Sequence, residues 1–445
     1  MAQTPTVTRR DFFATLAKSR EITGEMTYRK GRHGEKVSLL GYGAMRLPTK
    51  DGRAAMNRGA PGAAIDQEAV NEQVDFALAH GVNYFDTSPA YCRGESERVL
   101  GAALSRHPRE KYYIATKLSN FNEQTWPLEK SKEILANSLK TLRTDYIDFY
   151  LLHAVGIGGY ENFTGRYLKN GLIDWLAGQR EAGTVRNLGF SFHGDRKAFD
   201  WCIEHHDKYK WDFCQIQMNY VDWRHAQEVN TRNLDAKYLY EALTEKGIPV
   251  VVMEPLLGGR LARFNYAVAS KLKGMDPEAS LASWAFRFCG TFPNVLTILS
   301  GMTYMENIQE NIASLSPLKP LTKSQLDTLE EAALLVLRNK TLPCNLCQYC
   351  MPCPYGIDIP GNFDCWNRAC TEDRLPERGG ANYARDRKSF LAALDAAVPH
   401  LRQPEHCIGC GRCNPHCPQR IDIPAQMEML DNFISGLRKE ERSNV

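Results

Sequence analysis

The sequence predicts an α/β protein in which a (β/α)8 TIM barrel is followed by a smaller, mostly α-helical domain rich in cysteine. The first observation is a repeating pattern, in which eight apolar strand-like runs alternate with eight amphipathic runs over about 280 residues. The second is the uneven distribution of the 14 cysteines, of which four precede residue 343 and ten follow it. A chain of 445 residues is long enough for a barrel with an appended domain.

The expected strands are near-continuous apolar runs, which is typical of parallel strands buried on both faces. They cover residues 37–45, 84–88, 112–118, 147–153, 185–193, 213–220, 250–256 and 295–301. The expected helices cover residues 67–81, 96–106, 128–143, 172–183, 197–207, 234–247, 281–289 and 305–314. An open doubly wound sheet is the rival fold, but its phosphate-binding fingerprint needs a third glycine that the segment Gly41-Tyr42-Gly43 lacks.

These patterns divide the chain into five parts. They are an N-terminal segment (1–30), the barrel (31–318), a linker helix (319–342), the cysteine-rich domain (343–430) and a tail (431–445). The linker is long enough to run back along the barrel wall. Arg9 and Arg10 resemble a twin-arginine export signal, but the apolar stretch after them is shorter than such a signal needs, so we expect a cytoplasmic protein.

Composition excludes several classes of protein. The net charge is +3, with 43% hydrophobic and 24% charged residues, which is ordinary for a globular chain. This balance gives no electrostatic reason to expect nucleic acid or an anionic membrane as a partner. No apolar run approaches the length of a membrane-spanning helix.

Four chemically distinct side chains follow or end three consecutive predicted strands: Asp86 and Tyr91, then Lys117, then His153. In a (β/α)8 enzyme, catalytic groups lie at the carboxyl ends of strands. An ammonium beside a phenol favours the phenolate and lowers the pKa of the phenol, so Tyr91 could protonate a carbonyl oxygen. The alternative, in which each residue only forms a structural ion pair or hydrogen bond, does not explain why all four occur together.

The segment Asp86-Thr-Ser-Pro-Ala-Tyr91, Lys117 in Ala-Thr-Lys and His153 in Leu-Leu-His resemble the catalytic tetrad of the aldo/keto reductase superfamily. The resemblance covers about residues 36–316, and four residue types recur in order at strand ends. It implies hydride transfer between NAD(P)H and a small carbonyl or alcohol substrate, with Tyr91 as the general acid. The loops at 156–166 and 221–224 are expected to shape the substrate pocket.

The same resemblance implies a set of dinucleotide contacts. They are Gly43, Met45, Asp86, Ser191, Gln217, Met253, Pro255, Leu256, Gly258, Gly301 and Asn311. The family often has an aromatic residue at the position of Met253, and an asparagine at that of Phe192. The segment 300–307 contains no Lys or Arg to bind a 2′-phosphate, so NADH is at least as expected as NADPH.

The cysteine-rich region contains an internal repeat. Its two runs are Cys344-x2-Cys347-x2-Cys350-x2-Cys353-Pro and Cys407-x2-Cys410-x2-Cys413-x3-Cys417-Pro. The second run has the spacing of bacterial ferredoxins, in which three thiolates hold one [4Fe–4S] cluster and the fourth ligates the other cluster. This rule predicts two clusters, one on Cys344, Cys347, Cys350 and Cys417, the other on Cys407, Cys410, Cys413 and Cys353.

The first run departs from the ferredoxin spacing by one residue, so Cys365 or Cys370 could replace Cys353. Zinc is the rival metal, but it prefers two separated Cys-x2-Cys pairs. The whole chain therefore resembles the branch of aldo/keto reductases that carries a fused C-terminal 4Fe-4S ferredoxin-type domain.

Three functions remain open. The first is a nicotinamide-dependent reductase or dehydrogenase. The second is an electron-transfer oxidoreductase that passes electrons through the clusters to a redox partner protein, for which a flavin would divide the electron pair. In the third, the clusters only stabilise the tail or dock a partner.

Overall fold

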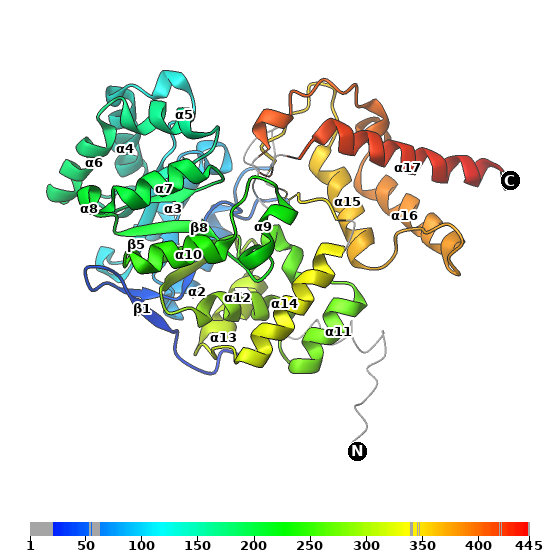
Figure 1. Cartoon of the computed structure of the whole chain (residues 1–445), viewed down its shortest axis with the longest axis horizontal. Helices are drawn as coiled ribbons and strands as arrows, with labels where there is room; N and C mark the ends of the chain where they lie inside the picture. Colours follow the sequence, from blue (N-terminus) through cyan, green and yellow to red (C-terminus); the bar gives the residue numbers. More distant parts are fainter. Residues whose placement is uncertain are drawn as a thin grey trace, which may run out of the picture.

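The computed structural model describes residues 21–52, 55, 63–338, 341–344, 346, 348–417, 419 and 421–443. Arg9, Arg10 and Cys347 therefore lie outside the described residues. The described chain forms a barrel and, beside it, a C-terminal group of helices (Figure 1). Within these ranges, no helix combines the length and the apolar character needed to cross a membrane.

Eight parallel strands close the barrel in the order β10-β3-β4-β5-β6-β7-β8-β9, which confirms the predicted fold class. Their bounds are β3 (Leu40–Gly43), β4 (Tyr84–Asp86), β5 (Tyr113–Leu118), β6 (Ile147–Val155), β7 (Val185–Phe192), β8 (Phe213–Gln217), β9 (Val250–Met253) and β10 (Val295–Ser300). Side chains of these strands fill the interior, including Tyr84, Phe149 and Phe213. The barrel is thus packed inside, and its chemistry is confined to its ends.

A short hairpin closes the amino-terminal end of the barrel. Strand β1 (Tyr28–Lys30) pairs antiparallel with β2 (Lys36–Ser38), and the fully buried Val37 joins the interior cluster with Tyr84 and Phe149. The single strand expected at 37–45 is therefore divided between this hairpin and β3. Strands of three residues are too short to give a periodic signal.

Each barrel strand is followed by a helix that covers the outside of the barrel. These helices are α2 (Gln67–Ala79), α3 (Ser96–Leu104), α4 (Leu128–Leu142), α6 (Leu172–Glu181), α7 (Arg196–Glu204), α10 (Ala236–Glu245), α12 (Leu281–Thr291) and α13 (Met305–Leu315). Shorter helices occupy the connections: α5 (Tyr160–Phe163), a π-helical turn (Thr164–Leu168), α8 (His206–Tyr209), α9 (Asp222–Val229) and α11 (Tyr266–Met275). Of these, α5 and α9 follow β6 and β8 and therefore lie at the carboxyl end of the barrel.

Helix α14 (Lys323–Arg338) lies within the residues assigned to the linker. It packs beside α11, and its buried side chains join the hydrophobic core between the strands and the barrel helices (Figure 1). These side chains are Leu329, Ala332, Ala333 and Val336. The linker helix is therefore part of the barrel wall.

The C-terminal region has its own hydrophobic core, formed by α15 (Ile359–Thr371), α16 (Tyr383–Ala397) and α17 (Ile423–Ser443). Phe433 of α17 packs edge-on against Trp366 of α15 and Phe390 of α16. The two cysteine runs lie in loops, one before α15 and the other before α17. The mostly helical domain that the sequence predicted is therefore present.

Candidate functional site

The structure brings the four predicted acid–base residues together at the carboxyl end of the barrel. Asp86 ends β4, Lys117 lies in β5 and His153 in β6, while Tyr91 begins the turn after β4. All four are buried, and Tyr91 is the most accessible at 8% exposure. Parallel pairing of β4, β5 and β6 aligns these residues, because adjacent strands end at the same edge.

A buried ion pair lies at the centre of this group. Lys117 Nζ donates to Asp86 Oδ1 at 2.6 Å, to Asp86 Oδ2 at 2.7 Å and to the carbonyl oxygen of Thr87 at 2.8 Å. Burial lowers the pKa of the Lys117 ammonium, and the carboxylate of Asp86 opposes that shift. The three acceptors hold the ammonium in one place, so its charge has a fixed position beneath Tyr91.

The ring of Tyr91 lies over this ammonium, with Lys117 Nζ 4.9 Å from the ring centroid. The expected lowering of its pKa is not found. Burial raises the pKa of Tyr91 well above its usual value, and the charges of Asp86, Tyr349 and Glu254 add to this shift. The prediction was wrong because it left out burial, which is the largest cause of the raised pKa, and the charge of the Asp86 carboxylate beside the ammonium.

His153 packs edge-on against Tyr91, with ring centroids 6.0 Å apart. Its Nδ1 lies 2.6 Å from Ser119 Oγ, and Arg166 Nη2 donates to its backbone carbonyl at 2.7 Å. Burial lowers the pKa of His153 well below its usual value, and the cations of Lys117 and Arg166 contribute. The imidazole is therefore neutral at physiological pH and can donate one N–H.

Sequence reasoning missed several of these neighbours. Ser119 follows β5 by one residue, and its position at a strand end was the available signal. Arg166 belongs to the loop expected to shape the pocket, but it is buried and bonds to the backbone beneath His153. Tyr349 comes from the cysteine-rich loop, more than 250 residues away in sequence, so no local pattern could place it beside Tyr91.

The expected dinucleotide contacts lie at or just after the carboxyl ends of β3, β4, β7, β8, β9 and β10, except Asn311, which lies in α13. Ser191 Oγ accepts a hydrogen bond from the backbone N–H of Ala154 at 2.7 Å, so β6 fixes its orientation. Gln217 Nε2 donates to Asp222 Oδ2 at 2.7 Å, which leaves the amide oxygen as an acceptor for a carboxamide N–H. The Ser191 hydroxyl and the Gln217 amide oxygen at this end of the barrel therefore fit the carboxamide of a nicotinamide.

The remaining expected contacts are largely explained by packing. A Cβ at Gly43 would lie 3.1 Å from the carbonyl oxygen of Ser300, and one at Gly301 would lie 3.1 Å from Arg46 Cδ. The Asn311 side chain donates to Ser300 Oγ at 3.1 Å. Of the other four positions, Pro255 is buried, and Met45 and Leu256 are half-buried. The fourth, Met253, accepts a hydrogen bond at Sδ from Gln215 Nε2.

Two features of the expected dinucleotide contacts were not predicted from the sequence. The Arg46 side chain, from the loop after β3, packs on Gly301. Segment 300–307 contains no Lys or Arg, so Arg46 brings a basic residue to it from elsewhere in the chain. Gly258 has a φ of 69°, and its N–H donates to Glu254 Oε2 at 2.6 Å. A carboxylate thus already uses one backbone donor of the loop expected to cover the pyrophosphate.

A cavity of about 290 Å³ opens beside Gln217 and His193, at the ends of β7 and β8. The loop that begins at Gly156 forms one wall of this cavity, whereas residues 221–224 do not line it. Burial lowers the pKa of His193 to about 4. The C-terminal region closes one side, because Asn230 Nδ2 donates to the carbonyl oxygen of Gln419 at 2.9 Å.

The described cysteines show part of the grouping that the ferredoxin rule predicts, although Cys350 of the first group lines a cavity together with Cys353, Cys410 and Cys413. The Cys413 thiol interacts electrostatically with those of Cys353, Cys407 and Cys410, and the Cys344 thiol with that of Cys417. The thirteen described cysteines form no disulfide bond with one another. By contrast, the charged neighbours of Cys365 are Asp364, Arg368 and Asp358 on or beside α15. The described thiols therefore fit two clusters with one exchanged ligand each.

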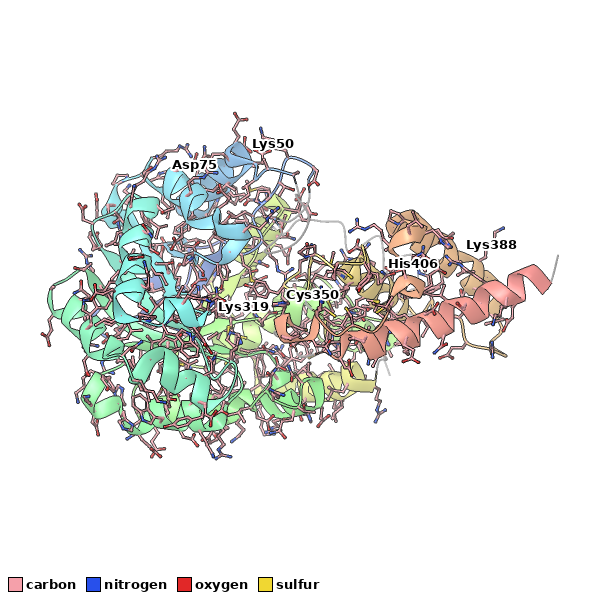
Figure 2. All side chains as sticks on the ribbon, turned by 90° about the horizontal axis from the view of Figure 1, so that it is seen from above. Lys50, Asp75, Lys319, Cys350, Lys388 and His406 are labelled. Atoms are coloured by element: carbon pink, nitrogen blue, oxygen red, sulfur yellow. The ribbon has the colours of Figure 1, made fainter. Side chains whose placement is uncertain are left out.

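A cavity of about 600 Å³ lies between thiols of both groups and the barrel. It is lined by Cys350, Cys353, Cys410 and Cys413, and by Arg93 from the turn after Tyr91. Figure 2 shows Cys350 where the barrel meets the C-terminal helices. The cysteine-rich loops therefore face the carboxyl end of the barrel, which is the end that carries the acid–base residues.

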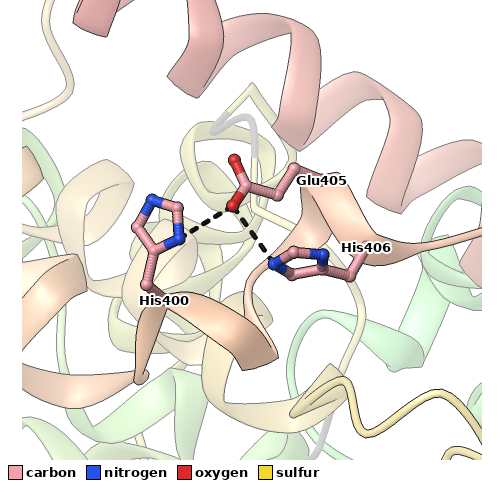
Figure 3. A group of neighbouring side chains, drawn as sticks. All are labelled: His400, Glu405 and His406. Atoms are coloured by element: carbon pink, nitrogen blue, oxygen red, sulfur yellow. Dashed lines mark ion pairs between the residues drawn. The ribbon is translucent and has the colours of Figure 1, made fainter.

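One more group of metal-ligating side chains occurs in the described part of the chain. Glu405 Oε1 lies 2.9 Å from His400 Nδ1 and 3.2 Å from His406 Nε2 (Figure 3). Arg438 of α17 lies beside them, 3.2 Å from His400 Nε2 and 3.7 Å from Glu405 Oε2. A guanidinium in this position repels a divalent cation, so we interpret the group as an ion-pair cluster that holds this segment against α17.

The fold and the site define a (β/α)8-barrel protein whose acid–base residues gather at the carboxyl ends of its strands. The chain belongs to the aldo/keto reductase family, since the sequence profile "Aldo/keto reductase family" matches residues 39–334. A second profile, "4Fe-4S dicluster domain", matches residues 343–421. The protein is therefore an oxidoreductase of this family with a fused iron–sulfur domain, as the resemblance implied.

Known proteins resemble the barrel part. L-galactose dehydrogenase of Arabidopsis thaliana is 26% identical over 336 residues, which cover 72% of this chain and 97% of that protein. The NADH-specific methylglyoxal reductase of Escherichia coli is 26% identical over 293 residues, covering 57% and 84%. The holo form of aldo-keto reductase AKR11C1 from Bacillus halodurans superimposes with a TM-score of 0.54 at 23% identity, covering 70% and 96%, which supports the fold.

The buried pair predicts a specific pattern of stability. We expect Lys117→Met to lower the free energy of unfolding by about 3–5 kcal/mol, because it leaves Asp86 buried without its cation. The double variant Asp86→Asn/Lys117→Met should recover most of this loss. Urea unfolding of the holoprotein, followed by tryptophan fluorescence, measures both.

Lys130→Met is the matched control, since Lys130 and Glu133 form an exposed pair with the same chemistry. Its effect should stay within about 0.5 kcal/mol. A double variant no more stable than Lys117→Met would show that the unpaired Asp86 carboxylate does not cause the loss of stability.

Proposed function

We propose that this chain transfers hydride between NAD(P)H and a small carbonyl or alcohol substrate, with Tyr91 as the general acid. The observation that carries the proposal is the convergence of Tyr91, Lys117, Asp86 and His153 at one end of the barrel. The family supports the substrate class, and the names of two relatives contain a sugar, L-galactose, and a small dicarbonyl, methylglyoxal.

When bound, the reduced dinucleotide would supply hydride to the carbonyl carbon. Tyr91 keeps its proton at neutral pH, because burial raises its pKa, and it gives that proton to the carbonyl oxygen as negative charge develops there. The neutral imidazole of His153 donates a second hydrogen bond to the same oxygen. The ammonium of Lys117, held by Asp86, stabilises the phenolate that remains.

Gln217 and Ser191 would hold the carboxamide of the nicotinamide, and the loop around Gly258 would cover the pyrophosphate. NADH is at least as well supported as NADPH, because Thr303 and its neighbours in segment 300–307 offer no cation of their own. The relative from Escherichia coli is named NADH-specific, which agrees with this preference.

Removal of one oxygen atom tests the role of Tyr91. We expect Tyr91→Phe to lower turnover by about 10²–10⁴-fold, since the ring stays over Lys117 while the proton donor is lost. NADH affinity, measured by fluorescence, should change less than about twofold. Turnover is measured with small aldehydes and ketones that include methylglyoxal, and with L-galactose in the oxidative direction.

Tyr355→Phe serves as the control, because Tyr355 is 45% exposed and lies in the iron–sulfur domain. Its turnover should equal that of the unmodified chain. Retention of full turnover by Tyr91→Phe would refute the assignment.

We further propose that the chain holds two [4Fe–4S] clusters, on Cys344, Cys347, Cys350 and Cys417 and on Cys407, Cys410, Cys413 and Cys353. The grouping of described thiols around Cys413 and around Cys344 supports this assignment. Iron–sulfur clusters are held by four thiolates each, and the exchange of the last ligand between the two runs is the ferredoxin arrangement.

Anaerobically prepared holoprotein should therefore contain about eight iron atoms per chain. We expect Cys413→Ala to reduce this to about four, because Cys413 faces the other three thiols of its group. Cys365→Ala is the matched control, since Cys365 is also partly buried in the same domain but has Asp364 and Arg368 as its charged neighbours. Loss of iron in this control, or a full complement in Cys413→Ala, would contradict the assignment.

A second candidate function is electron transfer between the barrel and the clusters, ending in a redox partner protein. It is favoured by one observation, namely that Tyr349 of the first cysteine loop interacts with Tyr91 at the barrel mouth. Two clusters together could take the two electrons of one hydride, but a flavin is normally needed to divide the pair.

This candidate predicts that NADH bleaches the visible sulfur-to-iron absorption of the anaerobic, substrate-free holoprotein. The bleaching should depend on NADH concentration. A one-electron acceptor should then reoxidise the clusters and restore the absorption. Tight NADH binding without bleaching would exclude this function and leave the clusters with a structural or docking role.

A further inference from the structure

A single arginine links the barrel loop after β9 to the iron–sulfur domain. Arg260 lies in the short helical turn Leu257–Ala262, and its Nη2 donates to Thr341 Oγ1 at 2.7 Å. The charges of the Asp222 carboxylate and of the Cys344 thiol both act on its guanidinium. The same cation therefore serves a cluster ligand and a carboxylate of the barrel.

Asp222 is the barrel partner in this arrangement. It begins α9 and is 1% exposed, and its Oδ2 accepts from Gln217 Nε2 at 2.7 Å and from Asn219 Nδ2 at 2.6 Å. Its Oδ1 is buried and has no hydrogen-bond partner among the described residues. A buried carboxylate with one unsatisfied oxygen depends on a nearby cation, and Arg260 supplies it.

Polar and charged side chains therefore follow one another across the barrel mouth. Gln217 donates to Asp222, and the charges of Asp222 and Cys344 both act on Arg260, which bonds to Thr341 three residues before Cys344. Gln217 is the position proposed to hold the nicotinamide carboxamide, and Arg260 lies in the loop proposed to cover the pyrophosphate. The hydrogen bond from Gly258 N–H to Glu254 Oε2 fixes the start of that loop, so Arg260 has a defined position.

We propose that Arg260 is a shared cation for which the first cluster and the anionic dinucleotide compete, so that reduction of this cluster weakens dinucleotide binding. This inference rests on the proposed function, because it requires a cluster on the Cys344 group and a dinucleotide at Gln217. One electron added to the cluster increases the negative charge beside Cys344 and holds the guanidinium there. The dinucleotide then loses part of its countercharge.

The direction of each effect follows from charge. A cation beside a cluster stabilises the reduced state and raises the reduction potential, whereas a carboxylate that neutralises this cation lowers it. Arg46 also faces Cys344, so removal of Arg260 shifts the potential without leaving the cluster free of cations. By linkage, dinucleotide binding changes the reduction of the cluster by the same factor as reduction changes the binding.

The first test is a redox titration of the holoprotein at about pH 8, followed by electron paramagnetic resonance. We expect Arg260→Leu to make one-electron reduction of one cluster about tenfold less favourable, which corresponds to a midpoint about 59 mV more negative. Asp222→Asn should shift the same cluster in the opposite direction, because it leaves the cation unneutralised. Arg260→Lys should remain within about twofold of the unmodified chain.

Arg263→Leu is the matched control, since Arg263 ends the same turn and is exposed. It should leave both midpoints unchanged. If Arg260→Leu fails to hold its clusters, the opposite shift in Asp222→Asn still decides the question. Shifts of the same sign in the two variants, or no shift in either, would overturn the proposal.

The second test measures dinucleotide affinity in both redox states. The probe is tetrahydro-NAD, an NADH analogue that cannot donate hydride, and dithionite supplies the electron. We expect reduction to weaken its binding by about tenfold in the unmodified chain and by less than about twofold in Arg260→Leu. An equal loss in both proteins would overturn the proposal. Absence of iron, or of any dinucleotide binding, would instead refute the proposed function.

Discussion

The arrangement of side chains at the carboxyl end of the barrel depends on one buried ion pair. Lys117 donates to both oxygens of Asp86 and to a backbone carbonyl, so neither charge can reorient without leaving a partner unsatisfied. This pair fixes the charge beneath Tyr91 and keeps the surrounding electric field small. A proton on Tyr91 and a neutral ring at His153 are consequences, because burial then dominates both pKa values.

The second organising feature is the position of the iron–sulfur domain. Its cysteine loops meet the carboxyl end of the barrel, where Arg46, Arg93 and Arg260 approach the thiols. Each of these arginines comes from a different strand–helix loop. The loops that surround the active site in a barrel enzyme therefore also form the surface on which this domain rests.

The sequence was sufficient to predict the barrel and the iron–sulfur domain, and to name the candidate acid–base residues and cluster cysteines, because each depends on a local pattern. Strand ends identify Asp86 and Lys117, and the spacing of a cysteine run identifies its cluster. Contacts between distant segments were not predictable. Tyr349 reaches Tyr91, and Arg260 reaches Cys344, only because the domain folds back over the barrel.

The pKa of Tyr91 was misjudged for a related reason. A sequence shows that an ammonium is near a phenol, but burial and the compensating charge of Asp86 become visible only in three dimensions. The hairpin that carries Val37 escaped notice because its strands are too short to be periodic.

Helix α14 has a consequence for how such a protein could be taken apart. Its side chains from Leu329 to Val336 belong to the barrel core, although the sequence assigns them to a connection. The natural seam between the two modules therefore lies after Arg338, immediately before the first cysteine run. A barrel fragment cut after Arg338 would keep this helix, whereas one cut before Lys323 would expose the core surface that Leu329 and Val336 cover.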